Sequence, residues 1–212
     1  MSESYRLFDF HIFDDKTTGE YVFHIQMFGI NENGETASII VNDYMPFFYV
    51  KVFDKWSEKE TRMFSTDIEK NIPNALNSMR IVQKKKLYGF NDNKKFQFLY
   101  LKFTNTISMN RVKRYIMTNK FSGRKLELYE SGIPPLLRYF HVNSISPSGW
   151  VEISSDFQDD DSNTTCAYNY LCSSSDLKPL NNKESMVPYK ICSYDIEASS
   201  SHGDFPVPKK SF

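Results

Sequence analysis

The sequence predicts an α+β protein in which strands dominate. Short runs of aromatic and β-branched residues, separated by turn residues, fill the first quarter of the chain. Of two later segments, one opens with a capping box and the other carries apolar residues at helical spacing. The 212 residues are 40% hydrophobic and 16% aromatic, which is typical of a globular protein rather than a disordered or fibrous one. This length suffices for one substantial core, or for one domain and part of another.

Four strands are predicted in order at the start of the chain. Their sequences are YRLFDFHIF, YVFHIQMFGI, TASIIV and FFYVKVF, at residues 5–13, 21–30, 36–41 and 47–53. The segments between them contain Gly, Asn and Pro, which suit the backbone angles of chain reversals. We expect these strands to form a meander or a small barrel-like sheet.

Two helices follow from capping and periodicity. Ser57 precedes Glu60 by three residues in the form of a capping box, which predicts a helix over residues 57–72. In residues 108–119, apolar side chains recur at helical spacing while three basic side chains point elsewhere, which predicts a second, basic helix.

The remaining segments read as a hairpin and a linker. Strands are predicted at residues 81–90 and 96–103, joined through NDNKK. Residues 154–186 are polar, acidic and rich in Ser and Asn around a short TCAYNYL strand. This composition predicts a domain edge or a surface linker.

The last predicted strand follows Pro188 and contains two carboxylates, Asp195 and Glu197. Because strand residues alternate between faces, both side chains lie on one face, about 7 Å apart. A rigid strand that offers two carboxylates is half of a site for two divalent cations. The same spacing occurs at Glu58 and Glu60, which we interpret as a solvated face, so spacing alone leaves both interpretations open.

Half of all cations occur in residues 80–125, which contain 13 Lys or Arg and a single acid, whereas the rest of the chain has 13 basic and 25 acidic residues. Basic residues interleaved with aromatic ones are typical of surfaces that neutralise phosphates and stack bases. The predicted nucleic-acid-binding residues are Lys84, Lys85, Lys86, Lys94, Lys95, Arg111, Lys113 and Arg114. In the alternative interpretation, the rings face the core and the lysines face solvent. That alternative explains the rings but not the concentration of cations.

Other kinds of site find no support. Cys166, Cys172 and Cys192 are odd in number and lack CxxC spacing, which argues against a disulfide framework and a zinc site. The four histidines lack metal-ligand spacing, and no glycine-rich phosphate loop or serine-triad motif occurs. Without a run of about 18 apolar residues or a secretory leader, we expect an intracellular protein with no membrane partner.

The segment YKICSYDIEASSSHGDFPVP, residues 189–208, resembles the first exonuclease motif of family B DNA polymerases, a strand with a D-I-E core and a loop that ends in Gly-x-Phe-Pro. Upstream, YESGIPPLLRYFHVNSISPSGWVEI at residues 129–153 is similar to a block that precedes this motif in the delta-type branch and its large-DNA-virus relatives. LYGFNDNKKFQFLYLKF and MPFFYVKV are similar to blocks of the same N-terminal domain. The resemblance covers nearly the whole chain.

The resemblance implies a replicative DNA-directed DNA polymerase, a nucleotidyltransferase. Residues 1–186 would be its template-contacting N-terminal domain, OB-like with a mixed sheet and two or three helices. Residues 187–212 would begin an RNase H-like 3′-5′ proofreading exonuclease domain. Asp195 would ligate both Mg²⁺ ions, and Glu197 would hold the ion that activates the attacking water. The implied partners are single-stranded or primer-template DNA and a sliding clamp, in the nucleus or at a cytoplasmic viral replication site.

The chain departs from the family pattern in two ways. Ala198 stands where the delta branch often has Cys, which is a minor change. The second and third exonuclease motifs and the polymerase palm motifs have no counterpart before Phe212. We therefore expect this chain to be inactive alone and to need the remainder of the polymerase chain or a complementary split subunit. The alternative is a stand-alone nucleic-acid-binding or interaction module derived from such a polymerase.

Overall fold

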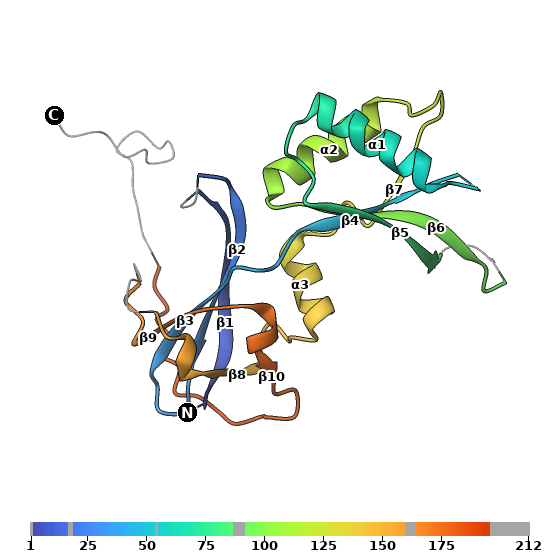
Figure 1. Cartoon of the computed structure of the whole chain (residues 1–212). Helices are drawn as coiled ribbons and strands as arrows, with labels where there is room; N and C mark the ends of the chain where they lie inside the picture. Colours follow the sequence, from blue (N-terminus) through green and yellow to red (C-terminus); the bar gives the residue numbers. More distant parts are fainter. Residues whose placement is uncertain (1, 17–18, 54, 87–91, 160–163, 196–212) are drawn as a thin grey trace, which may run out of the picture.

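A computed structural model of the chain describes residues 2–16, 19–53, 55–86, 92–159 and 164–195. These residues form two sheets and three α-helices, arranged as two lobes (Figure 1). The first lobe comprises the described residues up to 45 and those between 135 and 195, and the second lobe comprises the described residues between 46 and 134. Each lobe has its own hydrophobic core, and the predicted strand-rich α+β class is confirmed.

The first lobe is built on a six-stranded sheet. Its strands are β1 (Ser2–Asp15), β2 (Val22–Ile30), β3 (Thr36–Val41), β8 (Trp150–Ser154), β9 (Tyr168–Cys172) and β10 (Lys178–Pro179), in the order β10-β8-β1-β2-β3-β9. Neighbouring strands are antiparallel except β3 and β9, which are parallel. Phe23, Ile25 and Met27 are buried at alternate positions of β2, because strand side chains alternate between faces. One face of the sheet therefore carries the first core.

The second lobe has a four-stranded sheet with two helices on one face. Its elements in chain order are β4 (Phe47–Lys51), α1 (Glu58–Asn71), β5 (Ser78–Lys85), β6 (Lys95–Lys102), α2 (Thr106–Thr118) and β7 (Glu127–Tyr129). The sheet order is β5-β6-β4-β7 with antiparallel neighbours, so two β-α-β units interlock in the ferredoxin-like arrangement. Both helices lie above the sheet in Figure 1, which leaves the opposite face without a helix from this lobe.

Local signals explain where the helices begin. Ser57 and Glu60 form the predicted capping box at the start of α1. At the start of α2, the Asn105 side chain accepts a hydrogen bond of 2.7 Å from the backbone N–H of Ser108. The third helix, α3 (Pro135–Asn143), opens with a proline, whose missing N–H would have no partner in the first turn.

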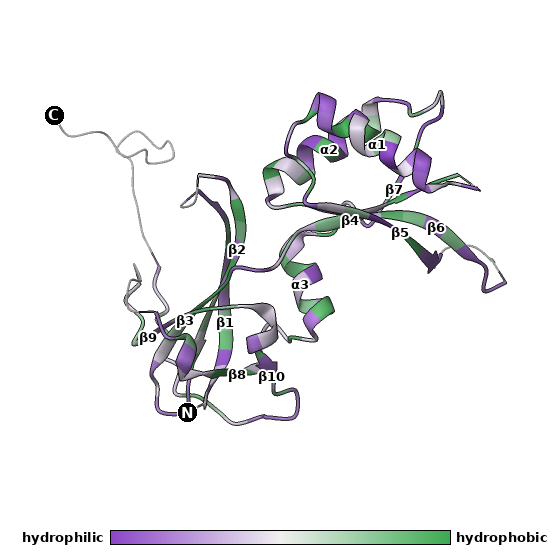
Figure 2. Ribbon diagram, viewed as in Figure 1, coloured by the Kyte–Doolittle hydropathy of each residue, from purple (hydrophilic) through white to green (hydrophobic). Residues whose placement is uncertain are grey.

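The second core joins the sheet to the helices. Phe48 and Val50 of β4 and Leu99 of β6 point to the helix side and are fully buried. The three α2 side chains that face them are the ones predicted by helical spacing, Met109, Val112 and Ile116. In Figure 2, β6 is largely hydrophobic, whereas the helices alternate between hydrophilic and hydrophobic stretches. This alternation is typical of helices that bury only one face.

The strands and helices predicted for the first half are present, but they do not form one sheet. β1, β2 and β3 make the expected meander. The fourth predicted strand, residues 47–53, becomes β4 of the second sheet, so the prediction of a single sheet for all four strands is wrong. The reason is that Phe48 and Val50 bury against α1 and α2, which the chain supplies only after β4.

The prediction of a linker over residues 154–186 is also wrong for much of that segment. β9 pairs with β3, and Tyr170, Cys172 and Leu177 are buried in the first core. Two short 3₁₀ helices, η1 (Ser155–Phe157) and η2 (Ser174–Asp176), flank this strand. The short strand predicted at TCAYNYL is present as β9, but the polar composition did not indicate that it belongs to the first core, because β9 buries few residues and exposes Leu171.

The strand predicted after Pro188 is not found in the described part of the chain, where residues 181–195 adopt neither strand nor helix. Residues 196–212, which include Glu197 and Ala198, lie outside the described residues. A single strand forms only when another strand pairs with it. No described strand pairs with residues 189–195, so these residues do not adopt the predicted pleated geometry.

Candidate nucleic-acid interface and acidic pair

The four-stranded sheet presents a face of aromatic and basic side chains on the side away from α1 and α2. We call this the open face, and its residues are Phe47, Tyr49, Lys51, Arg80, Val82, Lys84, Lys86, Phe96, Phe98, Tyr100, Lys102, Glu127 and Tyr129. Strand alternation separates these residues from the buried side chains that contact the helices. Strand register then places Tyr49 opposite both Tyr100 and Tyr129.

The rings of the open face form a continuous array across three strands. The ring centroids of Phe47 and Tyr100 are 4.8 Å apart, and those of Tyr49 and Tyr100 are 5.2 Å apart. The array continues through Phe98, which is 6.5 Å from Tyr49 and 5.1 Å from Tyr129. Aromatic pairs at such separations stabilise one another and hold their rings in place. The array therefore has a defined geometry that comes from the sheet.

Cations lie over the rings of this array. The Lys84 ammonium is 5.6 Å from the Tyr49 ring centroid, and the Arg80 guanidinium is 5.2 Å from that of Tyr100. Lys86 lies 4.9 Å from the Phe96 ring and 5.4 Å from the Tyr129 ring. These are cation–π distances, and at exposed sites such contacts are weak enough to exchange for other partners.

Acidic side chains are few at this face and are paired. The Glu127 carboxylate lies 4.0 Å from the Lys51 ammonium. At the border of the face, Glu130 forms an ion pair with Arg138 of α3, whose guanidinium also lies 4.5 Å from the Phe47 ring centroid. The Phe47 end of the array is therefore covered by α3, whereas the other end is not.

The tyrosines of the open face remain protonated at neutral pH. Burial raises the pKa of Tyr49, and the nearby Glu130 carboxylate adds to this effect. Burial, followed by the neighbouring Tyr49, raises the pKa of Tyr100. Burial and the Glu127 carboxylate raise the pKa of Tyr129 in the same way. Each phenol therefore stays neutral and able to donate a hydrogen bond.

The structure divides the eight predicted nucleic-acid-binding residues between two sides of the sheet. Lys84 and Lys86 lie on the open face, and the Lys94 ammonium is 5.5 Å from the Phe96 ring centroid. Lys85 alternates to the opposite side, where its ammonium donates a 3.0 Å hydrogen bond to Asn93 Oδ1, and it pairs in register with Lys95. The other three residues belong to α2, and among them Lys113 donates to the Ser131 carbonyl at 2.7 Å. The eight residues therefore do not form a single surface.

Sequence reasoning missed several residues of the open face. Lys51, Arg80 and Lys102 were not among the predicted residues, and neither were the rings of Tyr49 and Tyr129. A signal for part of this set was present, because Phe47, Tyr49 and Lys51 alternate with buried Phe48 and Val50. What the sequence did not show is which strands lie beside β4.

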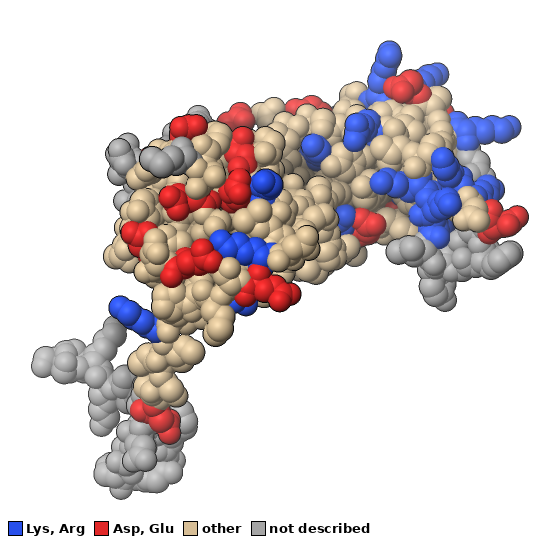
Figure 3. Space-filling view, turned by 90° about the horizontal axis from the view of Figure 1, so that it is seen from below, with Lys and Arg blue, Asp and Glu red and all other residues tan. Residues whose placement is uncertain are grey.

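The charge asymmetry of the sequence becomes an asymmetry between the lobes. Residues 46–134 contain 18 Lys or Arg and 8 Asp or Glu, whereas the rest of the chain contains 8 basic and 18 acidic residues. Figure 3 shows Lys and Arg gathered at the second lobe and Asp and Glu over much of the first lobe, in a view from below that shows the side away from α1 and α2. A polyanion would therefore be attracted to the second lobe.

The structure places only one member of the predicted acidic pair. Asp195 is exposed at the end of the described chain, and Glu197 lies outside the described residues. Within the described ranges, no group of three or more His, Cys, Asp or Glu side chains is placed to hold a metal ion. Because a hard-cation site needs several converging oxygens, the described residues alone do not fit a divalent cation.

The segment that leads to Asp195 is anchored on the first lobe. We call residues 180–189 the strap. Val187 is buried against Ile30 and Trp150, and the Lys183 ammonium lies 4.0 Å from the Trp150 ring centroid. Lys183 also pairs with Glu32 at 3.4 Å. These contacts fix the strap as far as Val187, eight residues before Asp195.

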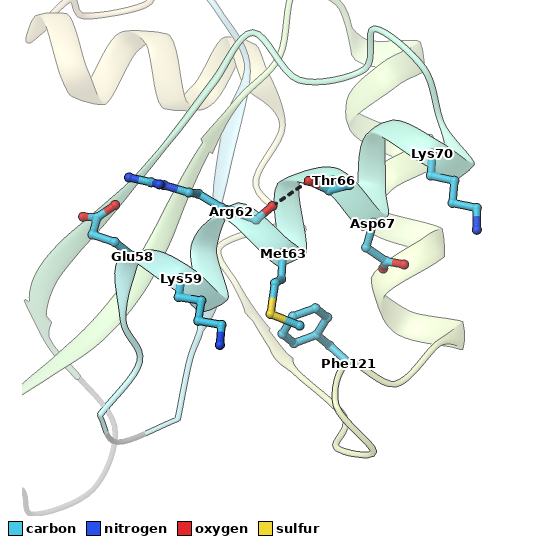
Figure 4. Close-up of a pocket in the computed structure, with 8 residues that line it drawn as sticks. All are labelled: Glu58, Lys59, Arg62, Met63, Thr66, Asp67, Lys70 and Phe121. Carbon is cyan, nitrogen blue, oxygen red and sulfur yellow. Dashed lines mark hydrogen bonds between the residues drawn. The ribbon is translucent and has the colours of Figure 1, made fainter.

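A separate groove of about 660 Å³ lies along the outer side of α1 (Figure 4). Met63 projects into it toward Phe121, and the lining side chains of opposite charge include Lys59 and Asp67. The Thr66 hydroxyl donates a 3.0 Å hydrogen bond to the Arg62 carbonyl within the helix. None of the predicted site residues lines this groove, so it is separate from both candidate sites.

Comparison with known proteins gives a family match for part of the chain. The family described as DNA polymerase family B, exonuclease domain, matches residues 126–211. The chain is 42% identical over 246 aligned residues to a DNA polymerase of Phaeocystis pouchetii virus, covering all of this chain and 23% of that protein. It is 24% identical to the DNA polymerase delta catalytic subunit of Dictyostelium discoideum, covering 88% of this chain and 19% of that protein. The chain thus spans less than a quarter of the length of these relatives.

The fold is also similar to that of a solved polymerase. The structure of the family B DNA polymerase from the hyperthermophilic archaeon Pyrobaculum calidifontis superimposes with a TM-score of 0.62 at 14% sequence identity. The match covers 88% of this chain and 21% of that one. Among the described residues, no helix has both the length and the apolar character that crossing a membrane requires.

Proposed function

Because this chain is related to the N-terminal and exonuclease region of family B DNA polymerases, we propose that it serves as the DNA-contacting N-terminal portion of a replicative DNA-directed DNA polymerase. The observation that carries this proposal is the alignment of the entire chain with a viral DNA polymerase. The cationic second lobe supports it, because a polymerase must hold a polyanionic template. Such a polymerase would act inside the cell, either in the nucleus or at a cytoplasmic site of viral replication.

We further propose a division at residue 187. Residues 1–186 form the template-contacting domain, and residues 187–212 begin the 3′-5′ exonuclease domain. The anchored strap supports this division, because it fixes the chain on the first lobe just before Asp195.

Asp195 and Glu197 are proposed as two carboxylates of a Mg²⁺ site that further residues complete. Those residues would come from the remainder of the polymerase chain or from a complementary subunit, since two carboxylates supply too few oxygens for two ions. The chain alone is then inactive as a nuclease. A sliding clamp is a proposed partner of the complete polymerase, not of any surface identified in this chain.

DNA binding and nuclease assays on the chain test this proposal. We expect it to bind labelled primer-template and single-stranded DNA at low salt, and the logarithm of the binding constant should fall linearly with the logarithm of the salt concentration. With Mg²⁺ present, we expect no trimming of the 3′ end. Failure to bind any DNA at low salt would refute the DNA-contacting role. Robust 3′ trimming that Asp195→Ala abolishes would refute the proposed inactivity.

A further inference from the structure

We propose that the open face is a stacking platform for unpaired bases of single-stranded DNA. This inference rests on the proposed function and adds to it a surface, a binding mode and a preferred form of DNA. The bases would stack on Tyr49, Phe96, Tyr100 and Tyr129, and the flanking lysines and Arg80 would contact the phosphates.

The topology supplies the first argument. α1 and α2 cover only one face of the second sheet, and α3 reaches the other face only near Phe47. The central strands β4 and β6 carry rings on the uncovered part of that face, and Tyr49 and Tyr100 lie directly opposite each other. Four-stranded sheets that bind single strands stack two or three bases on aromatic side chains of the sheet. The open face has rings on the same kind of surface.

The state of the rings supplies the second argument. Tyr49, Phe96, Tyr100 and Tyr129 are partly exposed, whereas Phe98 is 3% exposed and supports its neighbours from within the array. A ring that serves only to fill a core has no reason to remain accessible beside basic side chains. The array is therefore both fixed in geometry and open to a ligand.

The cations supply the third argument, which is charge complementarity. Five basic side chains belong to the open face, and its acidic member Glu127 is paired with Lys51. Lys84 and Lys86 lie over the Tyr49 and Phe96 rings at 5.6 and 4.9 Å, where they occupy the positions that bases would take. Lysine side chains are long and flexible, so they can turn from the rings to phosphates when a strand binds. The aromatic rings and the basic side chains of the open face can therefore bind the bases and the phosphates of the same strand.

The shape of the surface distinguishes single-stranded from duplex DNA. In a duplex, neighbouring bases cover one another's faces, so rings set in a sheet cannot stack on them. An unpaired strand exposes its base faces, and every base has one, so stacking of this kind tolerates many sequences. The α2 cations Arg111 and Arg114 lie across the sheet from the array. We therefore assign them no part in base stacking.

The test compares the whole chain with three double variants, using fluorescence anisotropy with a labelled 16-nucleotide oligo-dT. In Tyr49→Leu/Tyr100→Leu the apolar bulk stays and two rings are lost, so we expect the dissociation constant to rise at least about tenfold with an unchanged salt slope. Lys84→Glu/Lys86→Glu should weaken binding and flatten the salt slope. The matched control, Arg111→Glu/Arg114→Glu, should weaken binding less than either. Thermal melting identifies any variant that has lost its fold.

A second measurement needs no variant. With oligonucleotides that carry 5-iododeoxyuridine, ultraviolet crosslinks on the unaltered chain should map to peptides that contain Tyr49, Phe96, Tyr100 or Tyr129. Crosslinks confined to α2, or an unchanged affinity in the leucine variant, would overturn the proposal. Tighter binding of blunt duplex, or of oligo-U RNA, would overturn it as well. If the unaltered chain bound no DNA at low salt, the proposed function itself would fail, which is a different result.

Discussion

At the scale of single residues, a hydrogen bond between two tyrosines fixes part of the first core. The hydroxyl oxygens of Tyr5 and Tyr170 lie 2.8 Å apart, and both side chains are at most 2% exposed. Burial and this hydrogen bond raise the pKa of Tyr5 far above its ordinary value. The two hydroxyls therefore stay protonated and satisfy each other, in a place where an unpaired polar group would be costly.

The pair predicts a non-additive response to mutation. Tyr5→Phe and Tyr170→Phe each leave one buried hydroxyl without its partner, so each should lower the free energy of unfolding by about 1–3 kcal/mol. The double variant removes both polar groups and should lose less than the sum of the two single losses. Urea denaturation followed by circular dichroism measures all three values. Strict additivity would show that the hydrogen bond does not couple the residues.

Residue identity alone could not separate the two sides of the second sheet. Lys84 and Lys85 are chemically identical neighbours. The Lys84 ammonium lies over the Tyr49 ring, whereas Lys85, on the opposite side of the sheet, donates a hydrogen bond to Asn93. The sequence predicted both as ligands because their composition is the same. Strand alternation could have separated them from each other, but it could not have placed Lys84 beside a ring from β4, which is 35 residues away in the sequence.

At the scale of elements, helix α1 shows how much a local signal can specify. Its capping box joins the Ser57 backbone N–H to the Glu60 carboxylate at 2.9 Å. Both residues are close in sequence, so the sequence alone predicted this contact and the start of the helix.

The cap predicts a measurable contribution to stability. Ser57→Ala removes the side-chain acceptor for the first turn and should lower the free energy of unfolding by about 1 kcal/mol. Ser65→Ala, inside the same helix, is the matched control and should change it by less than about 0.5 kcal/mol, because alanine favours the helix interior. Chemical denaturation of both variants measures the difference. Equal losses in the two variants would count against the cap.

The pairing and packing of elements with distant partners were harder to predict. β9 has five residues and forms because β3 offers it a free edge more than 125 positions earlier in the chain. α3 was not predicted, although Pro135 marks its start, because only its Tyr139 and Phe140 side chains reach deep into the first core. The strand expected near Asp195 illustrates the converse, since its residues have strand composition but no described strand pairs with them.

At the scale of the whole molecule, the basic surface and the anchored segment before Asp195 belong to different lobes. The second lobe gathers the cations, whereas the first lobe holds the strap that leads to Asp195. The proposed DNA contact and the proposed metal ligands therefore lie on different lobes.

A chimera tests the proposed metal ligands. This chain would replace the aligned 23% of the Phaeocystis pouchetii virus DNA polymerase, to which it is 42% identical. We expect Mg²⁺-dependent trimming of single-stranded 3′ ends, lost to background in Asp195→Ala and in Glu197→Ala, because each removes an anionic oxygen ligand.

Two controls make the chimera informative. Glu184→Ala removes an exposed carboxylate of the strap and should leave trimming intact. Primer extension by each variant shows that the chimera is folded. Undiminished trimming in Asp195→Ala, with primer extension retained, would remove Asp195 from the metal site.

The strands β1 to β4, the helices α1 and α2, the α1 cap, the buried stripe of α2 and the concentration of cations all follow from residues close together in the chain, and so they could be predicted. The split into two sheets, the place of β9 and the gathering of rings with lysines on one face depend on contacts between residues far apart. A single apolar segment could pack against several other segments of the chain with similar stability. Hydrophobic burial and strand pairing therefore determine these contacts only when the whole chain packs.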